Sequence, residues 1–178
     1  MNKLFKEIPH RRFNPLTREW VLVSPHRTKR PWQGKNEELS IEKQANYDPD
    51  CYLCPGNERA GGRQNEKYDS TYVFTNDFSA MLSGHETVSE DDDFFKIKSE
   101  RGLCRVVCFS ADHGKTIAEM SLTEIEKIIG VWQSEYTHLG KQEFINYVQI
   151  FENKGEIMGC SNPHPHGQIW ASESIPGE

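Results

Sequence analysis

The feature that most constrains the fold is one long amphipathic stretch at residues 121–140. Its large apolar residues recur in steps of three and four, which places them on one face of an α-helix. They are Leu122, Ile125, Ile129, Trp132, Tyr136 and Leu139. Ser121 and Glu124 have the spacing of a capping box, and Gly140 is a typical stop signal. The pattern predicts a single helix over residues 121–140 that packs on the core.

The rest of the chain has the composition of strands joined by polar turns. We expect short strands where β-branched and aromatic residues cluster, at residues 19–24, 72–75, 103–110, 147–151 and 168–171. The polar segments 31–50 and 89–93 predict loops, and residues 51–63 form a glycine-rich turn region. One helix among several strands favours an α+β fold with a largely antiparallel sheet.

The composition fits a globular domain in spite of its low apolar content. Hydrophobic residues make up 35% of the 178 residues, but 9 Phe, 6 Tyr and 4 Trp can still fill a core of ordinary size. No apolar run approaches the roughly 20 residues of a transmembrane helix, and the first residues carry no secretory pattern. Together with an odd number of cysteines, five, this favours a reduced, cytoplasmic chain over a disulfide framework.

Charge is distributed unevenly along the chain. Residues 1–30 carry eight Lys and Arg against two Glu, whereas the whole chain has a net charge of -6. A basic segment on an acidic protein indicates a local anion site, and a solvated arm is the alternative interpretation. Proteins that bind nucleic acid are usually basic overall, so that class is not favoured.

A pair of cysteines indicates a metal site. Cys51 and Cys54 form a C-x-x-C pair that can chelate one soft cation, and the Pro-Gly that follows predicts a turn rather than the helix of a redox pair. A structural zinc site needs two further ligands, for which His113 and His164 are candidates. A redox pair and two merely buried cysteines are the alternatives.

The other three cysteines have no such pattern. Cys104 and Cys108 lie four residues apart, on one face of an expected strand, and packing in the core is the favoured interpretation. Cys160 lies in a Gly-Cys-Ser turn, where it can line a site, and we assign it no nucleophilic role.

The most informative segment is Gly159–Trp170, GCSNPHPHGQIW. In an extended backbone, which its two prolines favour, the alternating residues His164, His166 and Gln168 share one face. A neutral imidazole is a good nucleophile near pH 7, and a glutamine amide can hydrogen-bond a phosphoryl oxygen, so the row suits phosphoryl transfer. Two histidines at this spacing are also a common metal-binding pattern, and the pattern alone leaves both interpretations open.

This segment resembles the active-site motif of the galactose-1-phosphate uridylyltransferases, a family of the histidine-triad (HIT-like) superfamily. The resemblance covers residues 10–173 and implies a HIT-like α+β fold. Further matching segments follow in the family's order, at residues 12–27, 30–34, 51–56, 73–78, 108–113 and 148–155.

The resemblance implies a role for each of the paired histidines. His166 would be the nucleophile that takes UMP from UDP-glucose, releasing glucose 1-phosphate, and passes it to galactose 1-phosphate to give UDP-galactose in a ping-pong reaction. Gln168 would stabilise the uridylylated state, and His164 would join Cys51, Cys54 and His113 around zinc. The substrate-binding residues that the resemblance implies are Arg27, Arg30, Asn76, Asp77, Phe78, Asn153, Gly159, Cys160, Ser161 and Gln168.

The resemblance also bears on domain organisation and partners. Members contain two HIT-like halves, so residues 1–178 would be the N-terminal half of a homodimeric enzyme, with the C-terminal half absent from this chain. Neither nucleic acid nor a membrane would be a partner. Two alternatives stay open: a zinc-stabilised fragment that binds UDP-sugars without turnover, and another nucleotidyltransferase or phosphorylase of the superfamily.

Overall fold

The computed structural model of the chain divides into two units, Met1–Ile41 and Glu42–Glu178. The residues that it describes are 10–14, 16–23, 45–84, 89–91, 96–155, 158, 160 and 162–176. In the first unit, β1 (His10–Asn14) and β2 (Glu19–Val23) form an antiparallel hairpin. The hairpin confirms the strand expected from residue 19 and adds β1, which the sequence pattern did not reveal.

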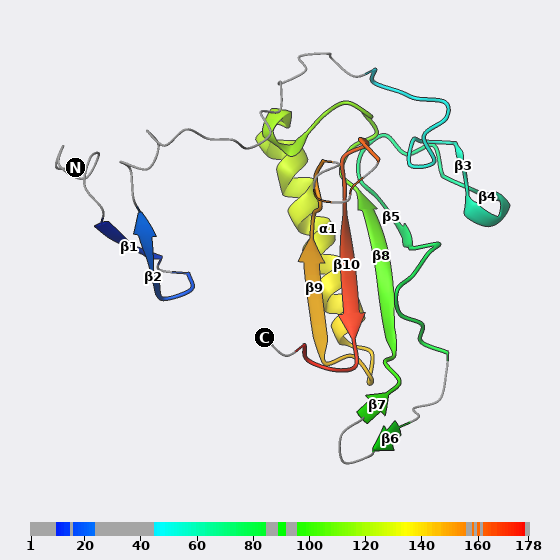
Figure 1. Ribbon diagram of the computed structural model, residues 1–178. Helices are drawn as coiled ribbons and strands as arrows, with labels where there is room; N and C mark the ends of the chain where they lie inside the picture. The colour runs from blue at the N-terminus through cyan, green and yellow to red at the C-terminus, as the bar shows by residue number, and fades with distance from the viewer. Residues whose placement is uncertain are drawn as a thin grey trace, which may run out of the picture. The chain divides into compact units, whose positions relative to one another are not determined.

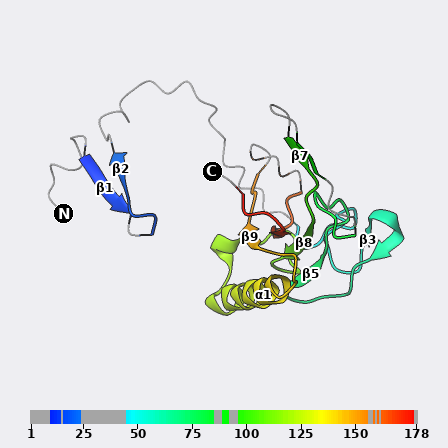
Figure 2. The same ribbon diagram turned by 90° about the horizontal axis from the view of Figure 1, so that it is seen from below.

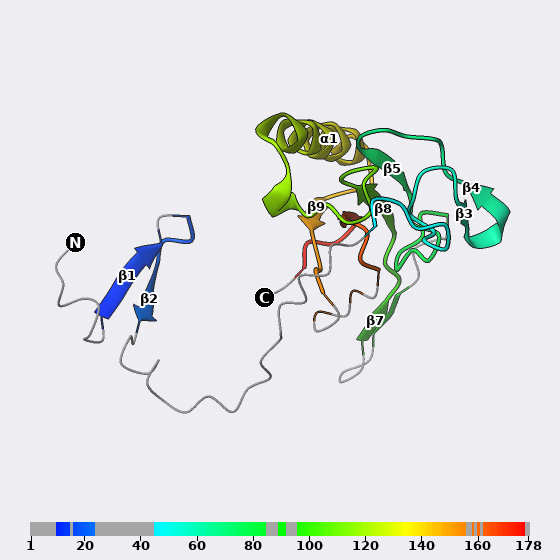
Figure 3. The same ribbon diagram turned by 90° about the horizontal axis from the view of Figure 1, so that it is seen from above.

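The second unit is built on a four-stranded antiparallel sheet with the order β5-β8-β10-β9 (Figure 1). Its strands are β5 (Tyr72–Thr75), β8 (Gly102–Cys108), β9 (Tyr147–Phe151) and β10 (His166–Ser172). Figures 2 and 3 show α1 (Leu122–Gly140) lying along one side of this sheet. The predicted α+β class and these four strands are confirmed, with strand ends moved by two residues at most.

The core between helix and sheet is made by alternate residues of the strands. Val107 of β8 and Ile169 of β10 are fully buried, and they pack in one cluster with Ile128 and Leu139 of α1. Burial of a large aliphatic side chain contributes roughly 1.5–3 kcal/mol, so this cluster is what holds α1 against the sheet.

The apolar stripe predicted for the helix is only partly right. Leu122, Ile129 and Tyr136 are 80%, 42% and 55% exposed, whereas Ile128, which the stripe left out, is 1% exposed. Leu139 is fully buried, as expected. Residues 125, 128, 132 and 139 also follow steps of three, four and seven, so spacing alone could not tell which of two adjacent helix faces packs on the sheet.

The cap of α1 links folding to pH through Glu124. Its carboxylate accepts hydrogen bonds from Lys115 Nζ at 2.7 Å and from the Ser121 N–H at 2.8 Å, and these bonds lower its pKa from 4.5 to about 2. A carboxyl group with a lowered pKa in the folded state stabilises the fold above its unfolded pKa and loses that contribution as the pH falls toward the folded value. Glu124→Gln should therefore lower the melting temperature at pH 7 by roughly 1–2 °C.

That difference should narrow as the pH is lowered from 4.5 toward 2, which melting curves across this range would measure. Glu126→Gln removes the same charge from an exposed position of the same helix and is the matched control. An equal and pH-independent loss in both variants would show that the cap does not act through the charge of Glu124.

The face of the sheet away from α1 carries the polar residues of β10. Because side chains alternate along a strand, His166, Gln168 and Trp170 lie on this face, opposite to Ile169. Their register partners on β8 are Cys108, Val106 and Cys104. Both cysteines of β8 are fully buried, which confirms their expected place in the core.

Shorter elements surround the sheet. The turn region holds the hairpin of β3 (Glu58–Arg59) and β4 (Arg63–Gln64) with the 3₁₀ turn Ala60–Gly62 between them, and a second 3₁₀ turn, Ile117–Glu119, precedes α1. In this region Gly61 and Gly62 have φ angles of +73° and +75°, a conformation that favours glycine.

One loop prediction is wrong. The acidic run expected to be a solvated loop at 89–93 contains β6 (Ser89–Asp91), which pairs with β7 (Lys96–Lys98). The backbone register sets Asp91 opposite Lys96, and this pairing cannot be predicted from the acidic run alone. In the part of the chain that the structure describes, no helix is long and apolar enough to cross a membrane.

Candidate active site and metal centre

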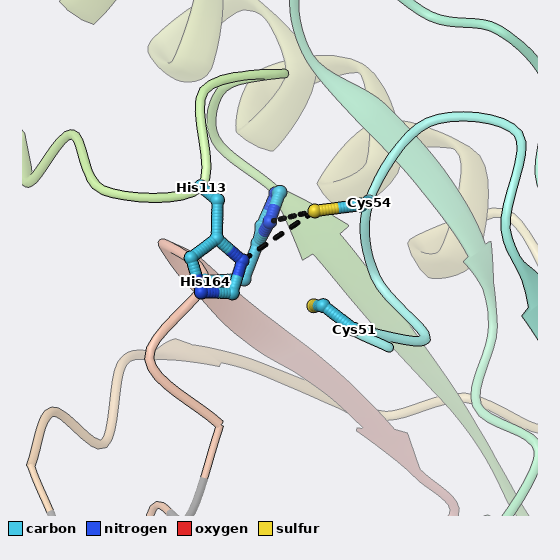
Figure 4. Close-up of side chains that lie close together, drawn as sticks. All are labelled: Cys51, Cys54, His113 and His164. Atoms are coloured by element: carbon cyan, nitrogen blue, oxygen red, sulfur yellow. Dashed lines mark hydrogen bonds between the residues drawn. The ribbon is translucent and has the colours of Figure 1, made fainter. Parts of the chain in front are cut away.

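Four buried side chains from three separate segments point toward one another (Figure 4). Cys51 and Cys54 lie in the turn before β3, His113 follows β8, and His164 precedes β10. Their ligand atoms all lie within 4.8 Å of one another, and Cys54 Sγ is 3.4 Å from His113 Nδ1 and 3.5 Å from His164 Nδ1. These four residues, the metal group, could hold a metal ion.

The strand pairing explains why two distant histidines meet. β8 and β10 run antiparallel, so the end of β8 lies beside the start of β10. The pairing continues one step further, because the Phe109 N–H donates to Pro165 O at 2.9 Å. The segments that carry His113 and His164 therefore lie next to each other.

Hydrogen bonds shape the turn that carries the two cysteines. The Cys54 N–H and Asn57 Nδ2 both donate to Cys51 O, at 3.1 and 2.8 Å. Asn65, which is 4% exposed, donates from Nδ2 to Tyr52 O at 2.8 Å and to Cys54 O at 2.9 Å. Asn57 and Asn65 thus donate hydrogen bonds to backbone carbonyls of the tight turn. The turn holds both thiols close to His113 and His164.

His164 is held with Nδ1 toward Cys54. Its Nε2 lies 2.9 Å from Ser110 O, and a carbonyl only accepts, so Nε2 carries the proton and Nδ1 has the lone pair of a ligand. Tyr68 Oη donates to Leu53 O and lies 3.2 Å from the same His164 Nε2. Burial lowers the pKa of His164 to about 4, which keeps the imidazole neutral, as a metal ligand must be.

The donor set fits a divalent cation that prefers sulfur and nitrogen. Ligands around a tetrahedral ion at roughly 2.0–2.3 Å lie roughly 3.3–3.8 Å apart. The two distances from Cys54 Sγ, 3.4 and 3.5 Å, fall in that range. Burial raises the pKa of Cys54 to about 11, so a thiolate at this position needs a cation beside it.

A pocket of about 280 Å³ lies on the same face of the sheet as His166 and Gln168. Its walls come from β5, β8, β10, the turn after β5 and the region around β3. The lining residues are Tyr52, Leu53, Glu58, Arg59, Ala60, Phe74, Asn76, Asp77, Phe78, Val106, His166 and Gln168. Leu53 lies between the two cysteines in the sequence, so the turn that carries them also forms a pocket wall.

His166 is oriented by the backbone just before its own strand. Its Nδ1 lies 2.7 Å from His164 O, which can only accept, so Nδ1 carries the proton of the neutral ring. The lone pair is then on Nε2. A neutral imidazole with a free Nε2 at a pocket wall can act as a nucleophile toward a phosphorus atom.

Two arginines hold Asp77 in the pocket wall. Arg59 Nη1 lies 3.2 Å from Asp77 Oδ2, and Arg63 Nη1 lies 2.8 Å from Oδ1. The side chains of Arg59 and Asp77 are 8% and 9% exposed, and the Arg59 guanidinium lies 3.8 Å from the centroid of the Phe74 ring. The two arginines therefore hold the Asp77 carboxylate in one position in the pocket wall. Its remaining lone pairs can accept hydrogen bonds from hydroxyl groups.

Gly167, between the two pocket residues of β10, is required by packing. A Cβ atom there would lie 2.7 Å from Phe109 Cζ and 2.9 Å from Phe151 O. Glycine thus lets a ring and a neighbouring strand approach from the helix side, while His166 and Gln168 keep their places on the other face.

The chain matches the model of one protein family over residues 2–176, described as the N-terminal domain of galactose-1-phosphate uridyl transferase. The chain belongs to this family. A galactose-1-phosphate uridylyltransferase from Haemophilus influenzae is 52% identical over 181 residues, which cover 100% of this chain and 51% of that protein. One from Saccharomyces cerevisiae is 46% identical over 187 residues, covering 98% and 51%. The chain spans about half the length of the curated relatives it matches.

Solved structures share the fold of this chain. A structure of uridylyltransferase has a TM-score of 0.61 at 24% identity, covering 95% of this chain and 47% of that one. An ADP-glucose phosphorylase from Arabidopsis thaliana, with bound ADP-glucose, has a TM-score of 0.61 at 22% identity, covering 96% and 50%. At these identities the likeness establishes the fold alone.

Most of the residues expected from the family resemblance are described by the structure, and these fall into three groups. His166, Gln168, Asn76, Asp77 and Phe78 line the pocket, and the four predicted metal ligands form the metal group. The residues that are described but do not line the pocket are Asn153, which is exposed, and Cys160, whose thiol donates to Asn162 O at 3.4 Å. Those outside the described residues are Arg27, Arg30, Gly159 and Ser161.

Other pocket residues had no signal of their own in the sequence. Arg59 and Ala60 lie in the glycine-rich turn region, and their place in the wall depends on the β3–β4 hairpin. Val106 and Phe74 belong to predicted strands, but the face of each strand that lines the pocket is set by the pairing of β5 with β8 and of β8 with β10.

Proposed function

We propose that this domain carries the catalytic histidine and the nucleotide pocket of a UDP-glucose–hexose-1-phosphate uridylyltransferase, which exchanges UMP between UDP-glucose and galactose 1-phosphate in galactose metabolism. The observation that carries the proposal is the orientation of His166. Its Nδ1 donates a hydrogen bond to His164 O, which leaves the lone pair on Nε2, and His166 lines the pocket together with Gln168. Family membership and the names of the relatives support the choice of substrates.

Two displacements at phosphorus accomplish the exchange. His166 Nε2 attacks the α-phosphorus of UDP-glucose, the P–N bond forms, and the bond to the glucose 1-phosphate oxygen breaks with its electron pair on that oxygen. The Nδ1 proton stays on the ring, held by His164 O, so the uridylylated imidazole is cationic. A phosphate oxygen of galactose 1-phosphate then attacks the same phosphorus, gives UDP-galactose and returns neutral His166.

The pocket residues divide between the nucleoside and the phosphates. Asp77, fixed by Arg59 and Arg63, is placed to accept hydrogen bonds from ribose hydroxyls, and Phe78 offers a ring to the base. Asn76 and Gln168 also line the pocket, are hydrogen-bonded to each other, and offer their amide groups to the nucleotide. The residues assigned to phosphates and the rest of the nucleotide are Arg27, Arg30, Asn153, Gly159, Cys160 and Ser161.

The metal group fits zinc in a structural role. Cys51, Cys54, His113 and His164 would supply four ligands and leave no open position, so the ion would stabilise the fold and take no part in the displacement. His164 also supplies the carbonyl that orients His166, and a fixed His164 therefore positions the nucleophile.

The organisation of the whole enzyme is also part of the proposal. Residues 1–178 correspond to an N-terminal HIT-like domain, a second HIT-like half contributes sugar-phosphate contacts, and the enzyme is a cytoplasmic homodimer. The coverage of about half of each relative supports the two-part organisation.

The proposal predicts that the chain gains one UMP when it is incubated with UDP-glucose, as intact-protein mass spectrometry would measure. It also predicts that labelled glucose 1-phosphate enters UDP-glucose, since the first displacement is reversible. Binding of UDP-glucose without adduct or exchange would instead show a binding module. A larger adduct yield from ADP-glucose than from UDP-glucose would favour an adenylyl-transferring enzyme of the same fold.

A further inference from the structure

A chain of hydrogen bonds links Phe78, Asn76, Gln168 and Trp170. The Phe78 N–H donates to Asn76 Oδ1 at 2.9 Å, and Asn76 Nδ2 donates to Gln168 Oε1 at 3.3 Å. From the other side, Trp170 Nε1 donates to the same Gln168 Oε1 at 3.1 Å. Gln168 Oε1 therefore receives two N–H groups.

The two ends of this chain fix the orientation of both amides. A backbone N–H and an indole N–H can only donate, so the atoms that face them must be oxygens. The Phe78 N–H thus fixes Asn76, which turns its nitrogen to Gln168, and the Trp170 N–H independently requires oxygen at the same point. Within the described residues, no group accepts a hydrogen bond from Gln168 Nε2.

We infer that Trp170 is a positioning residue that turns the Gln168 amide so that its NH₂ group is presented to a phosphoryl oxygen. The inference rests on the proposed function, in which Gln168 acts on the uridylyl group. With the amide turned over, Oε1 would face the phosphoryl oxygens and repel them, and Nε2 would face the Trp170 and Asn76 donors. Two donors on Oε1 also polarise the amide and make its NH₂ a stronger donor.

The placement of Trp170 argues against direct contact with the substrate. Trp170 lies two residues beyond Gln168 on the same face of β10, but it does not line the pocket and is 37% exposed. Its ring lies edge-on to Phe151 on β9, with centroids 5.5 Å apart and planes at 80°. The Phe151 contact fixes the indole, and the indole N–H in turn fixes Gln168.

The test is Trp170→Phe, which keeps an aromatic ring against Phe151 and removes the indole N–H together with the second ring of the indole. We expect the first-order rate of uridylylation at saturating UDP-glucose to fall about tenfold, with less than a twofold change in the half-saturating concentration. Trp132→Phe is the matched control, because Trp132 Nε1 is buried on the helix side without a partner in the described residues. That variant should keep the wild-type rate.

A double-mutant cycle separates positioning from a structural effect. If Trp170 acts through Gln168, Trp170→Phe should change the residual rate of Gln168→Ala by less than about twofold. An equal fold loss in both backgrounds, or a Trp170→Phe rate equal to that of wild type, would overturn the inference.

A second measurement does not depend on activity. The indole N–H proton resonance of Trp170, assigned by its loss in Trp170→Phe, should move upfield in Gln168→Ala, where its acceptor is gone. An unmoved resonance would overturn the inference. If the wild-type chain takes up no UMP at all, the proposed function fails, and this resonance alone decides whether Trp170 orients Gln168.

Discussion

Replacement of His166 with alanine is expected to leave the chain unable to take UMP from UDP-glucose, with a loss of rate on the order of 10⁶-fold. The reason is that His166 Nε2 is the only atom of the chain proposed to bond to phosphorus, and the alanine side chain has no lone pair to replace it. Gln168 and Asp77 would still bind the nucleotide, so the dissociation constant of UDP-glucose should change far less than the rate.

Intact-protein mass spectrometry after incubation with UDP-glucose measures the adduct, and calorimetry measures binding to the same variant. His138→Ala removes an imidazole from an exposed position near the end of α1 and should be uridylylated like wild type. An adduct that persists in His166→Ala, mapped by peptide analysis to another side chain, would refute the assignment of His166 as the nucleophile.

Much of the fold follows from local sequence patterns. Ser121 and Glu124 fix the start of α1 by their own hydrogen bonds, so the helix could be located without tertiary information. Ile128 and Ile129 differ in burial because of the direction from which the sheet packs, which no local pattern encodes. The pairing of β6 with β7 was missed for a related reason, since a strand made of Ser, Glu and Asp is defined by its partner.

The candidate site divides in the same way. Cys51 and Cys54 were visible as a pair because both ligands come from one turn, whereas His113 and His164 meet only through the pairing of β8 with β10. From the residues alone they were candidates, and the family resemblance selected them. Arg59 could not be connected with Asp77 from the sequence, because an ion pair between two loop segments depends on how the β3–β4 hairpin folds.

A signal for Trp170 was present in the sequence but had no interpretation there. It continues the alternation of His166 and Gln168 along β10, so its place on their face of the sheet could be predicted. Its hydrogen bond to Gln168 could not, because the indole position depends on Phe151 of the neighbouring strand.

Loss of the zinc proposed for the metal group is expected to destabilise the domain more than any other single change outside the hydrophobic core. An ion present at 1,000 times its dissociation constant stabilises the folded state by about 4 kcal/mol. For a chain of this size that corresponds to a fall in melting temperature of roughly 8–16 °C on chelation. Cys54→Ala should cause a similar fall, because it removes one of four ligands from a closed site.

The chain contains a matched control for this substitution. Cys54 and Cys104 are both fully buried, so Cys54→Ala and Cys104→Ala remove the same atom from equally covered positions, but Cys104 is not in the metal group. Elemental analysis should find one zinc per chain in wild type and in Cys104→Ala, and chelation should lower the melting temperature of both. Cys54→Ala should bind no zinc and be insensitive to chelator. A metal centre would be refuted if the two variants had equal melting temperatures and the chelator left the melting temperature of wild type unchanged. Each thiol would then contribute only its packing.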